Sequence, residues 1–435
     1  MMNESIALCE SMRKVLECLL PVFTAPGGSR FLSLAAGWLL ATGRRTITAM
    51  VRAAGLTAAG HYSSFYRFFS RGVWSRLILC RTWAKTMVGL FYPRGDILCC
   101  GDDSLMKHRG PKIHGAGIYR DPVLSSRGMT VFHWGHNWVV LCLMVKFPLW
   151  PHRWFAFPIN FRLRVKGEKT TVVELMWEMF HEAAEWFPGR TLVFCVDGTY
   201  SNLCGQLPAE GVLIGRLRGD AALFNRPPKP KPHQMGRHRV RGHRLPHPNV
   251  IASDPKTAWT TLKVWTYGQR RTAQVHSFLA IWSHVSKREV RVLLVRDPAQ
   301  PDKVDYFFCT DINRPICWVI ETYAARWSIE RTFEDVKQFL GIEHPQVWTE
   351  RSVNRVVPMG MILYGAVVLW YVKHAARRPP SADAWYHAKP HASFRDMLAA
   401  VRHTSRREYL FSRSAHMSDT KKVIETILQT LEAAA

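Results

Sequence analysis

The stretch from Thr170 to Thr199, TTVVELMWEMFHEAAEWFPGRTLVFCVDGT, predicts a helix followed by a buried strand. Thr171 precedes the helical pattern as an N-cap, and Pro188 ends it. The apolar residues of this helix recur at helical spacing and form one face, which consists of Leu175, Met176, Met179, Ala183 and Trp186. The short apolar run at 192–196 is typical of a buried strand, and it ends in Asp197.

Further strand patterns precede this unit. Residues 97–100 are a short apolar run that leads to Asp102 and Asp103, and residues 129–147 are rich in Val, Leu and aromatic residues, which predicts one or two strands. Strands followed by a helix and another strand predict an α/β core. Acidic residues therefore follow two predicted strands, at the edge of an open α/β sheet where ligands bind.

The pattern along the chain divides it into five segments. Residues 46–56 and 61–69 are two short helical patterns around a glycine, which is typical of a helix-turn-helix and equally of a plain helical hairpin. A proline-rich basic stretch interrupts the α/β part. We predict a helical, DNA-binding region at 1–92, a first core segment at 93–210, a β-rich insertion at 211–313 with an exposed basic arm at 226–248, a second core segment at 314–376 and a helical tail at 377–435.

The charge balance indicates a polyanionic partner. The 435 residues include 59 Lys and Arg but 33 Asp and Glu, so the formal net charge is +26. A surplus of this size attracts DNA, RNA or an anionic membrane. The hydrophobic content of 47% allows a sizeable core and excludes wholesale disorder.

Neither the cysteines nor the apolar segments predict secretion or membrane insertion. The ten cysteines are scattered without a CxxC pair, which is typical of small buried side chains in a reducing cytosol and not of a zinc ribbon. We expect no signal peptide, because no basic region is followed by a long apolar one. The uncharged segment 356–372 is shorter than the ~20 residues of a membrane span and contains Pro358, so we predict a buried core helix.

Residues 323–337, YAARWSIERTFEDVK, concentrate polar side chains that can act together. On a single helix with ~100° per residue, one stripe collects Tyr323, Arg326, Glu330, Glu334 and Lys337 beside an apolar stripe that can pack on a sheet. By periodicity alone, a solvated helix with ion pairs four residues apart is the simpler interpretation.

The strand-end aspartates change this balance. Two strand-end aspartates and Glu330 together supply the oxygen ligands of a hard Mg²⁺ or Mn²⁺ site of the kind that cleaves phosphodiesters. Either aspartate alone is also compatible with a turn or a helix cap. All three in a chain of charge +26 favour a metal-dependent nuclease site.

This segment resembles the tyrosine–arginine–glutamate–lysine (YREK) signature of bacterial insertion-sequence DDE transposases. The matching residues are Tyr323, Arg326, Glu330 and Lys337, which are separated by two, three and six residues. Other stretches are similar to one subgroup of that superfamily, namely DDS at 102–104, WGHNW at 134–138, DGTY at 197–200 and FLG at 339–341. The similarity covers about residues 95–372. It implies an α/β fold with an RNase H-like catalytic core, interrupted by a mainly β insertion, between a helical N-terminal region and a helical tail.

The resemblance also implies roles for individual residues. Asp197 and Glu330 correspond to the second and third catalytic, metal-binding carboxylates. Asp102 is the favoured first one and Asp103 the alternative, because Ser104 stands where the family usually has Thr. Tyr323, Arg326 and Lys337 would then bind the DNA backbone beside Glu330.

Other cations and aromatics are weaker candidates. Lys107 and Arg109 follow the first aspartates and can bind the DNA backbone, with a solvated loop as the equal alternative. The basic arm contributes Arg237, Arg239 and Arg241, with a surface loop that binds nothing as its alternative. Tryptophans of the insertion, Trp259, Trp265 and Trp282, are available for base stacking, although core packing is the commoner role.

The implied activity is cut-and-paste transposition, meaning strand cleavage at transposon ends and strand transfer into target DNA. It implies Mg²⁺ (or Mn²⁺), two ions per active site. The implied DNA partners are double-stranded terminal inverted repeats and target DNA. The resemblance also implies a second copy of the chain, in a homodimeric synaptic complex. The implied location is the nucleoid of the bacterial cytoplasm, and no membrane partner is expected. Two alternatives remain, a catalytically silent DNA-binding protein derived from a transposase and a structure-selective RNase H-like nuclease.

Overall fold

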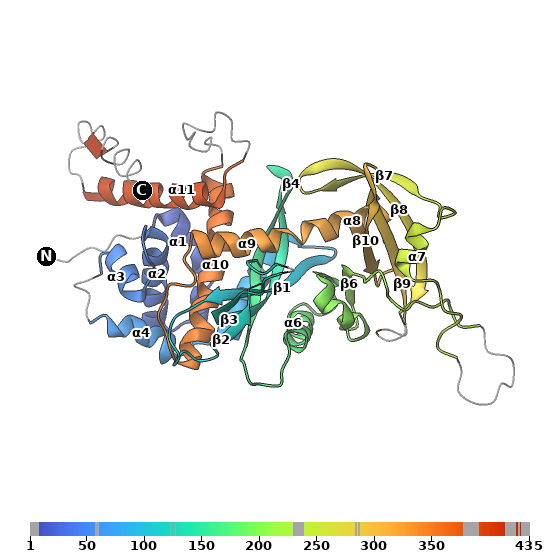
Figure 1. Cartoon of the computed structure of the whole chain (residues 1–435). Helices are drawn as coiled ribbons and strands as arrows, with labels where there is room; N and C mark the ends of the chain where they lie inside the picture. The colour runs from blue at the N-terminus through green and yellow to red at the C-terminus, as the bar shows by residue number, and fades with distance from the viewer. Residues whose placement is uncertain are drawn as a thin grey trace.

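The computed structural model describes residues 8–56, 61–121, 123–126, 128–228, 239–282, 285, 288–376, 391–413, 423, 424 and 427. Helices from both ends of the chain form one body, and a long sheet extends away from it (Figure 1). The helical body includes α10 (Glu350–His374) and α11 (Phe394–Arg413) next to the N-terminal helices. Strands β7 to β10 form the part of the sheet on the side of the core away from this body.

The described residues up to 92 are mainly helical, as the sequence predicts. They form α1 (Glu10–Glu17), the 3-10 helix η1 (Leu20–Val22), α2 (Ala25–Leu40), α3 (Ile47–Ala53), α4 (Ser63–Ser70) and α5 (Arg76–Phe91). The side chains of Thr24, Thr46 and Ser75 accept backbone N–H bonds in the first turns of α2, α3 and α5. α3 and α4 occupy the two patterns of the expected helix-turn-helix, and residues 57–60 between them lie outside the described residues.

The apolar segment 356–372 lies within α10 and is buried, as predicted. Among the described residues α10 is the one helix that is long and apolar enough to cross a membrane, yet most of it is enclosed by the rest of the chain. It packs against α1, α4, α5 and β4. The buried Arg355 guanidinium on α10 donates to the backbone carbonyls of Phe69, Gly72 and Trp74, which joins this helix to the end of α4.

The sheet has the strand order β2-β3-β1-β5-β6-β10-β9-β8-β7, with β4 paired to β3. Its first part consists of β1 (Ile97–Lys107), β2 (Gly117–Arg120), β3 (Phe132–Phe147), β4 (Trp150–Arg164), β5 (Leu192–Val196) and β6 (Gly211–Arg216). β1, β3 and β4 pair antiparallel, whereas β1, β5 and β6 pair parallel. The order β4-β3-β1-β5-β6 is the RNase H-like core that the resemblance implies, so the expected α/β fold class is confirmed.

The helix and strand predicted within residues 170–199 fold as expected. α6 (Val172–Trp186) begins with a capping box, in which Thr171 and Glu174 bond each other's backbone N–H groups. Its apolar face is buried, and α6 lies across the face of β3 and β4 before the chain returns through β5. Residues 132–147 form one strand, because Gly135 to Asn137 pair with the end of β1 and do not break the ladder.

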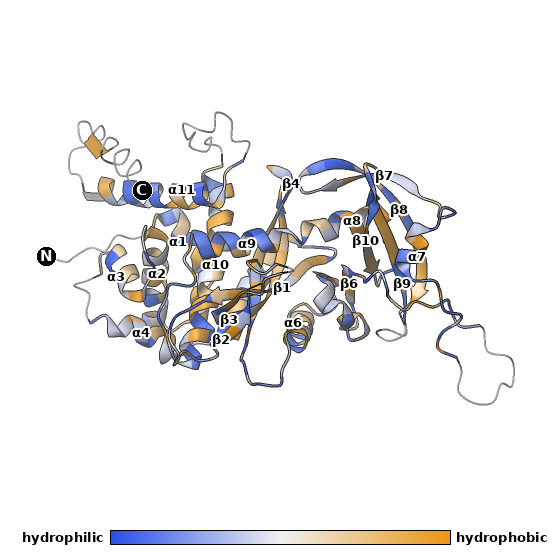
Figure 2. Cartoon of the chain, in the orientation of Figure 1, coloured by the Kyte–Doolittle hydropathy of each residue, from blue (hydrophilic) through white to orange (hydrophobic). Residues whose placement is uncertain are grey.

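The insertion continues the core sheet. β6, which the sequence analysis assigned to the insertion, pairs with β5 and is the fifth strand of the core. β10 (Gln300–Cys309) pairs with β6, followed outward by β9 (Glu289–Asp297), β8 (Gln269–Ile281) and β7 (Thr260–Thr266), after the short α7 (Pro248–Ser253). Figure 2 shows apolar residues along the central strands, whereas much of the visible side of α9 (Ser328–Gln338) is hydrophilic.

Gly37 marks a close approach of two helices and gives a test of the helical body. A Cβ at Gly37 on α2 would lie 2.0 Å from the Met50 carbonyl oxygen of α3, whereas a Cβ at the exposed Gly89 on α5 would meet nothing within 4 Å. We expect Gly37→Ala to destabilise the protein by about 1–3 kcal/mol through overpacking. Gly89→Ala should stabilise it by about 0.5–1 kcal/mol, because alanine is the better helix former.

Thermal unfolding of both variants by scanning fluorimetry measures this difference. A Gly37→Ala protein that melts with or above the wild type would contradict the close packing of α2 on α3.

Candidate active site

Asp102 and Asp197 lie side by side because of the parallel register of β1 and β5. The last pairs of this ladder are Cys100 with Cys195 and Gly101 with Val196, so the two aspartates are the next residues of the two strands. The expectation that Asp102 and Asp103 follow their strand is wrong, because β1 continues to Lys107 along its antiparallel partner β3. What ends just before Asp102 is the pairing of β1 with β5, and not the strand β1 itself.

The alternation of side chains along β1 separates Asp102 from Asp103. Asp102 points to α8 (Ile316–Ala325) and α9, where its Oδ2 lies 2.9 Å from Arg326 Nη1. Asp103 points to the opposite face, where a Cβ added at Gly101 would touch Met176 of α6. Of the two alternatives for the first carboxylate, Asp102 is therefore the one that shares a face with Glu330.

The stretch 323–337 forms two helices and not the single helix that its periodicity predicts. α8 ends at Ala325 and α9 begins at Ser328. Between them the N–H groups of Arg326, Trp327, Ile329 and Glu330 bond carbonyls three residues back, which tightens the helical turn. The break lets each helix bury its own apolar face, since α8 packs on β5, β6 and β7 whereas α9 packs on β1 and β4.

Arg326 stands at this junction and bridges two carboxylates. Its Nη1 donates to Asp102 and its Nη2 lies 3.0 Å from Glu330 Oε1. The guanidinium is buried, with 10% of its side chain exposed, so its charge is balanced by these two partners at short range. The structure thus brings Arg326, Asp102 and Glu330 together, as the YREK resemblance predicts.

Burial and like charges perturb the carboxyl groups. Burial is the main cause that raises the pKa of Asp102 to about 7, and the charges of Asp197 and Asp103 add to it while Arg326 opposes it. Burial also raises the pKa of Glu330, again against Arg326 and with a contribution from Asp197. The charge of Asp197 thus contributes to the raised pKa of both Asp102 and Glu330. Perturbed carboxylates in one cluster are typical of active sites.

Tyr323 and Lys337 lie along the same side of the α8–α9 pair. Lys337 Nζ donates to Ser104 Oγ over 2.8 Å, and burial lowers the pKa of this amine. The Arg326 guanidinium lies 5.6 Å from the Tyr323 ring centroid, and burial raises the pKa of this phenol to about 12. Glu334 does not join the stripe, because it is exposed and pairs with Arg331.

The remaining sequence candidates lie apart from this cluster. Lys107 ends β1 and its amine lies 3.0 Å from Asp121, and Arg109 is exposed just after it. Arg239 and Arg241 are exposed near the outer part of the sheet, where Phe224 bridges to Arg244 and to β8. Arg237 lies outside the described residues.

The donor set of the three carboxylates suits a hard divalent cation, because it consists of oxygen atoms alone. Among the described residues, however, no three His, Cys, Asp or Glu side chains are close enough together to hold a metal ion as they stand. Between Asp102 and Glu330 lies the Arg326 guanidinium, which donates to both carboxylates.

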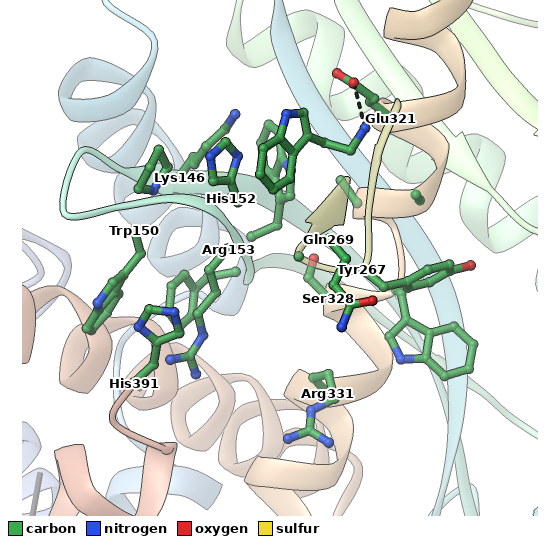
Figure 3. A pocket seen from close by; sticks show the side chains of 18 of the residues that line it. Lys146, Trp150, His152, Arg153, Tyr267, Gln269, Glu321, Ser328, Arg331 and His391 are labelled. Atoms are coloured by element: carbon green, nitrogen blue, oxygen red, sulfur yellow. Dashed lines mark hydrogen bonds between the residues drawn. The ribbon is translucent and has the colours of Figure 1, made fainter. Parts of the chain in front are cut away.

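A cavity of about 1220 Å³ lies beside the α8–α9 junction (Figure 3). It is bounded by the tips of the β3–β4 and β7–β8 hairpins, which meet where His152 stacks on Trp265 with ring centroids 3.5 Å apart. Exposed Tyr267 and Trp327 stand at one side with their ring centroids 6.2 Å apart, and Arg331 lies nearby. Its walls thus combine aromatic rings with cations.

Of the three tryptophans that the sequence offered for base stacking, one lies in this wall. Trp265 lines the cavity, whereas Trp259 stacks under Arg296 and Trp282 is buried against Phe308. The sequence prediction did not include Tyr267, although the Tyr267-Gly268 pair is typical of a hairpin turn. In this turn Tyr267 has a backbone φ of +52°. This conformation is uncommon for a bulky residue and is a mark of functional sites.

Comparison with known proteins agrees with this geometry. The sequence profile of a family described as DDE superfamily endonuclease matches residues 18–279, which is more than half of the chain. The matched part includes β1 with Asp102 and β5 with Asp197, and it ends before α8 and α9. No curated protein matches the chain. From the fold, the paired aspartates and this match, we conclude that the chain belongs to the DDE superfamily endonuclease family.

Proposed function

We propose that the protein is the DNA transposase of an insertion sequence, which cuts at transposon ends and joins the cut strand to target DNA. The observation that carries this proposal is that Asp102 and Asp197 directly follow the last pair of the parallel β1–β5 ladder, while Arg326 joins Asp102 to Glu330 and Lys337 contacts Ser104 on the same face. Membership of an endonuclease family and the charge of +26 support DNA as the substrate.

Asp102, Asp197 and Glu330 would hold Mg²⁺ or Mn²⁺, two ions per active site. Bound ions activate a water or a 3′-hydroxyl as nucleophile and stabilise the leaving oxygen of the phosphodiester. The carboxylates must be ionised for this, and the raised pKa of Asp102 makes that condition depend on pH.

Arg326 would exchange partners when DNA binds. Its fork of N–H donors is now shared between Asp102 and Glu330, and a phosphate of the DNA backbone competes for the same donors. Release of the carboxylates would then coincide with substrate binding. Lys337 and Tyr323 flank this position and would bind the neighbouring phosphates. Lys107, Arg109, Arg239 and Arg241, which lie apart from the cluster, would bind the DNA backbone elsewhere.

The aromatic cavity supports handling of unpaired DNA. Tyr267, Trp265 and Trp327 offer stacking surfaces worth about 1–3 kcal/mol per base, next to the junction that carries Arg326. We further propose a homodimer that pairs two terminal inverted repeats at the bacterial nucleoid, because joining two ends requires two active sites.

The two alternatives differ in measurable ways. A catalytically silent DNA-binding protein has no need of two carboxylates joined by a buried arginine beside a third carboxylate at a strand end, and this arrangement favours an enzyme. A structure-selective nuclease would cut DNA but would not join a cut 3′ end to a second duplex. A strand-transfer assay with pre-cut ends therefore separates it from a transposase.

Asp197→Ala and Glu330→Ala should abolish cleavage of transposon-end DNA and leave end binding nearly unchanged, because metal ligands contribute little to phosphate contacts. Wild-type cleavage should need Mg²⁺ or Mn²⁺ and fail with Ca²⁺ alone. Gel assays of cleavage and of binding measure the two effects separately. Near-normal cleavage by either variant, or cleavage in excess chelator, would contradict the proposed site.

Arg326→Ala should weaken complexes with cut ends by about tenfold or more and affect unrelated duplex less, because a bidentate contact at one phosphate is lost. Arg326→Lys keeps the charge but not the fork and should recover only part of the affinity. Arg218→Ala is the control, since Arg218 is exposed and pairs with Asp220. Equal losses on cut ends and unrelated duplex would reduce Arg326 to a general charge.

Metal affinity should fall on the acid side of pH 7. Burial raises the pKa of Asp102 to about 7, so below that value its carboxyl is protonated and cannot ligate a metal. The Mg²⁺ concentration for half-maximal cleavage should therefore rise from about pH 8 to pH 6, by up to about tenfold per unit below the pKa.

The same shift has the opposite sign for stability without metal. A carboxyl whose pKa is raised on folding binds its proton more tightly in the folded state, so the stability it contributes falls as pH rises from about 4 to 7. The melting temperature of Asp102→Asn relative to wild type over this range isolates the contribution.

For the metal-affinity prediction, a half-maximal Mg²⁺ concentration that is constant between about pH 6 and 8 would contradict the raised pKa of Asp102.

A further inference from the structure

Asp103 has its own set of partners on the face of β1 away from Arg326. Its Oδ1 accepts a hydrogen bond of 2.6 Å from the Tyr200 hydroxyl, and its Oδ2 accepts one of 3.0 Å from Asn137 Nδ2. Tyr200 is fully buried, and Asn137 is 8% exposed. Neither donor is charged, so the carboxylate is held by hydrogen bonds and no ion pair of the described residues includes it.

Tyr200 connects Asp103 to the element that carries Asp197. It lies in the 3-10 helix η2 (Gly198–Gly205), whose N-cap is Asp197, and its own N–H faces the Asp197 carbonyl at 3.3 Å. Backbone pairing between β1 and β5 stops at Gly101 and Val196, just before the two aspartates. Beyond that point the Tyr200–Asp103 hydrogen bond is a direct link between the two chain segments.

Asp103 is also coupled to Asp102. The backbone N–H of Asp103 donates to Asp102 Oδ1 over 2.9 Å, while Arg326 holds Asp102 Oδ2. Two bonds on the Asp103 side chain, from η2 and from β3, therefore fix the peptide group that orients the neighbouring carboxylate. If Arg326 leaves for a phosphate, this N–H is the contact that keeps Asp102 in place.

From these contacts we propose that Asp103 is a positioning residue, which Tyr200 and Asn137 lock so that Asp102 and Asp197 stay at the separation needed for a shared divalent cation. The inference rests on the proposed function, because it takes Asp102 and Asp197 as metal ligands. Asp103 itself does not ligate the metal, since its side chain lies on the opposite face of β1.

The chemistry of the two donors explains why this position needs a carboxylate. A hydroxyl and an amide N–H₂ converge on Asp103, and an ionised carboxylate accepts from both. An asparagine would accept one bond and direct its own N–H₂ at the other donor. Partners of this kind that orient a metal ligand typically change metal affinity about 10–100-fold when they are removed.

The test is Mn²⁺ binding to the full-length protein in complex with cut transposon-end DNA, with the same DNA alone as the blank, measured by calorimetry or by the EPR signal of free Mn²⁺. Tyr200→Phe removes one hydroxyl and keeps the ring, and Asp103→Asn removes one acceptor. Each should raise the Kd for Mn²⁺ about tenfold. The double variant should be weaker by less than the product of the two single effects, because both substitutions disturb the Tyr200–Asp103 hydrogen bond while Asp103→Asn also disturbs the one from Asn137.

Tyr119→Phe is the matched control. The Tyr119 hydroxyl donates to the Arg164 carbonyl over 2.9 Å on β2, so this variant loses a comparable bond outside the carboxylate cluster. Its Kd for Mn²⁺ should equal that of the wild type. Melting temperatures in metal-free buffer verify that each variant is folded, and a purely structural role would lower the melting temperature without changing the Kd.

Asp102→Ala separates the two levels of the proposal. If Asp102→Ala loses Mn²⁺ binding while folded Tyr200→Phe binds as the wild type does, the positioning role is overturned and the metal site stands. If Asp102→Ala binds Mn²⁺ unchanged, both the metal site and the positioning role are overturned. Loss in Asp102→Ala together with a weaker Tyr200→Phe supports both.

Discussion

The parallel pairing of β1 with β5 is the constraint on which the site depends. It joins segments about 95 residues apart and brings Asp102 level with Asp197 where their ladder ends. The antiparallel hairpin of β3 and β4 covers the other edge of β1 and holds the strand straight past that point. Arg326 contacts Asp102 and Tyr200 contacts Asp103, just beyond the last pair of this ladder.

Charge balance sets the second requirement. Three carboxylates that sense one another would repel if nothing lay between them, and the buried guanidinium of Arg326 neutralises two of them. Burial of Asp102 makes its ionised form costly unless a cation lies beside it. Arg326 supplies that charge, and its fork reaches two carboxylates at once.

The α8–α9 junction connects the two halves of this arrangement. Its tightened turn lets α8 rest on β5 to β7 while α9 crosses β1 and β4, and it leaves Arg326 at the point where both helices face the strands. The aromatic cavity lies beside the same junction, with Trp327 following Arg326 directly in sequence.

The sequence by itself determined the local elements and the chemistry of the site. Capping at Thr171 and the apolar run at 192–196 are short-range patterns, and each predicted its element correctly. The periodicity of 323–337 placed polar side chains on one face, but it wrongly predicted a single helix and included Glu334. The choice between Asp102 and Asp103 stayed open, because adjacent residues of a strand differ only in the face that a partner gives them. The tertiary structure settled that choice, because α9 lies on the face of β1 that carries Asp102. It also determined that β1 continues along β3, that 323–337 forms two helices, and that the cavity lies between hairpins distant in sequence. These features depend on packing between segments, which no local spacing encodes.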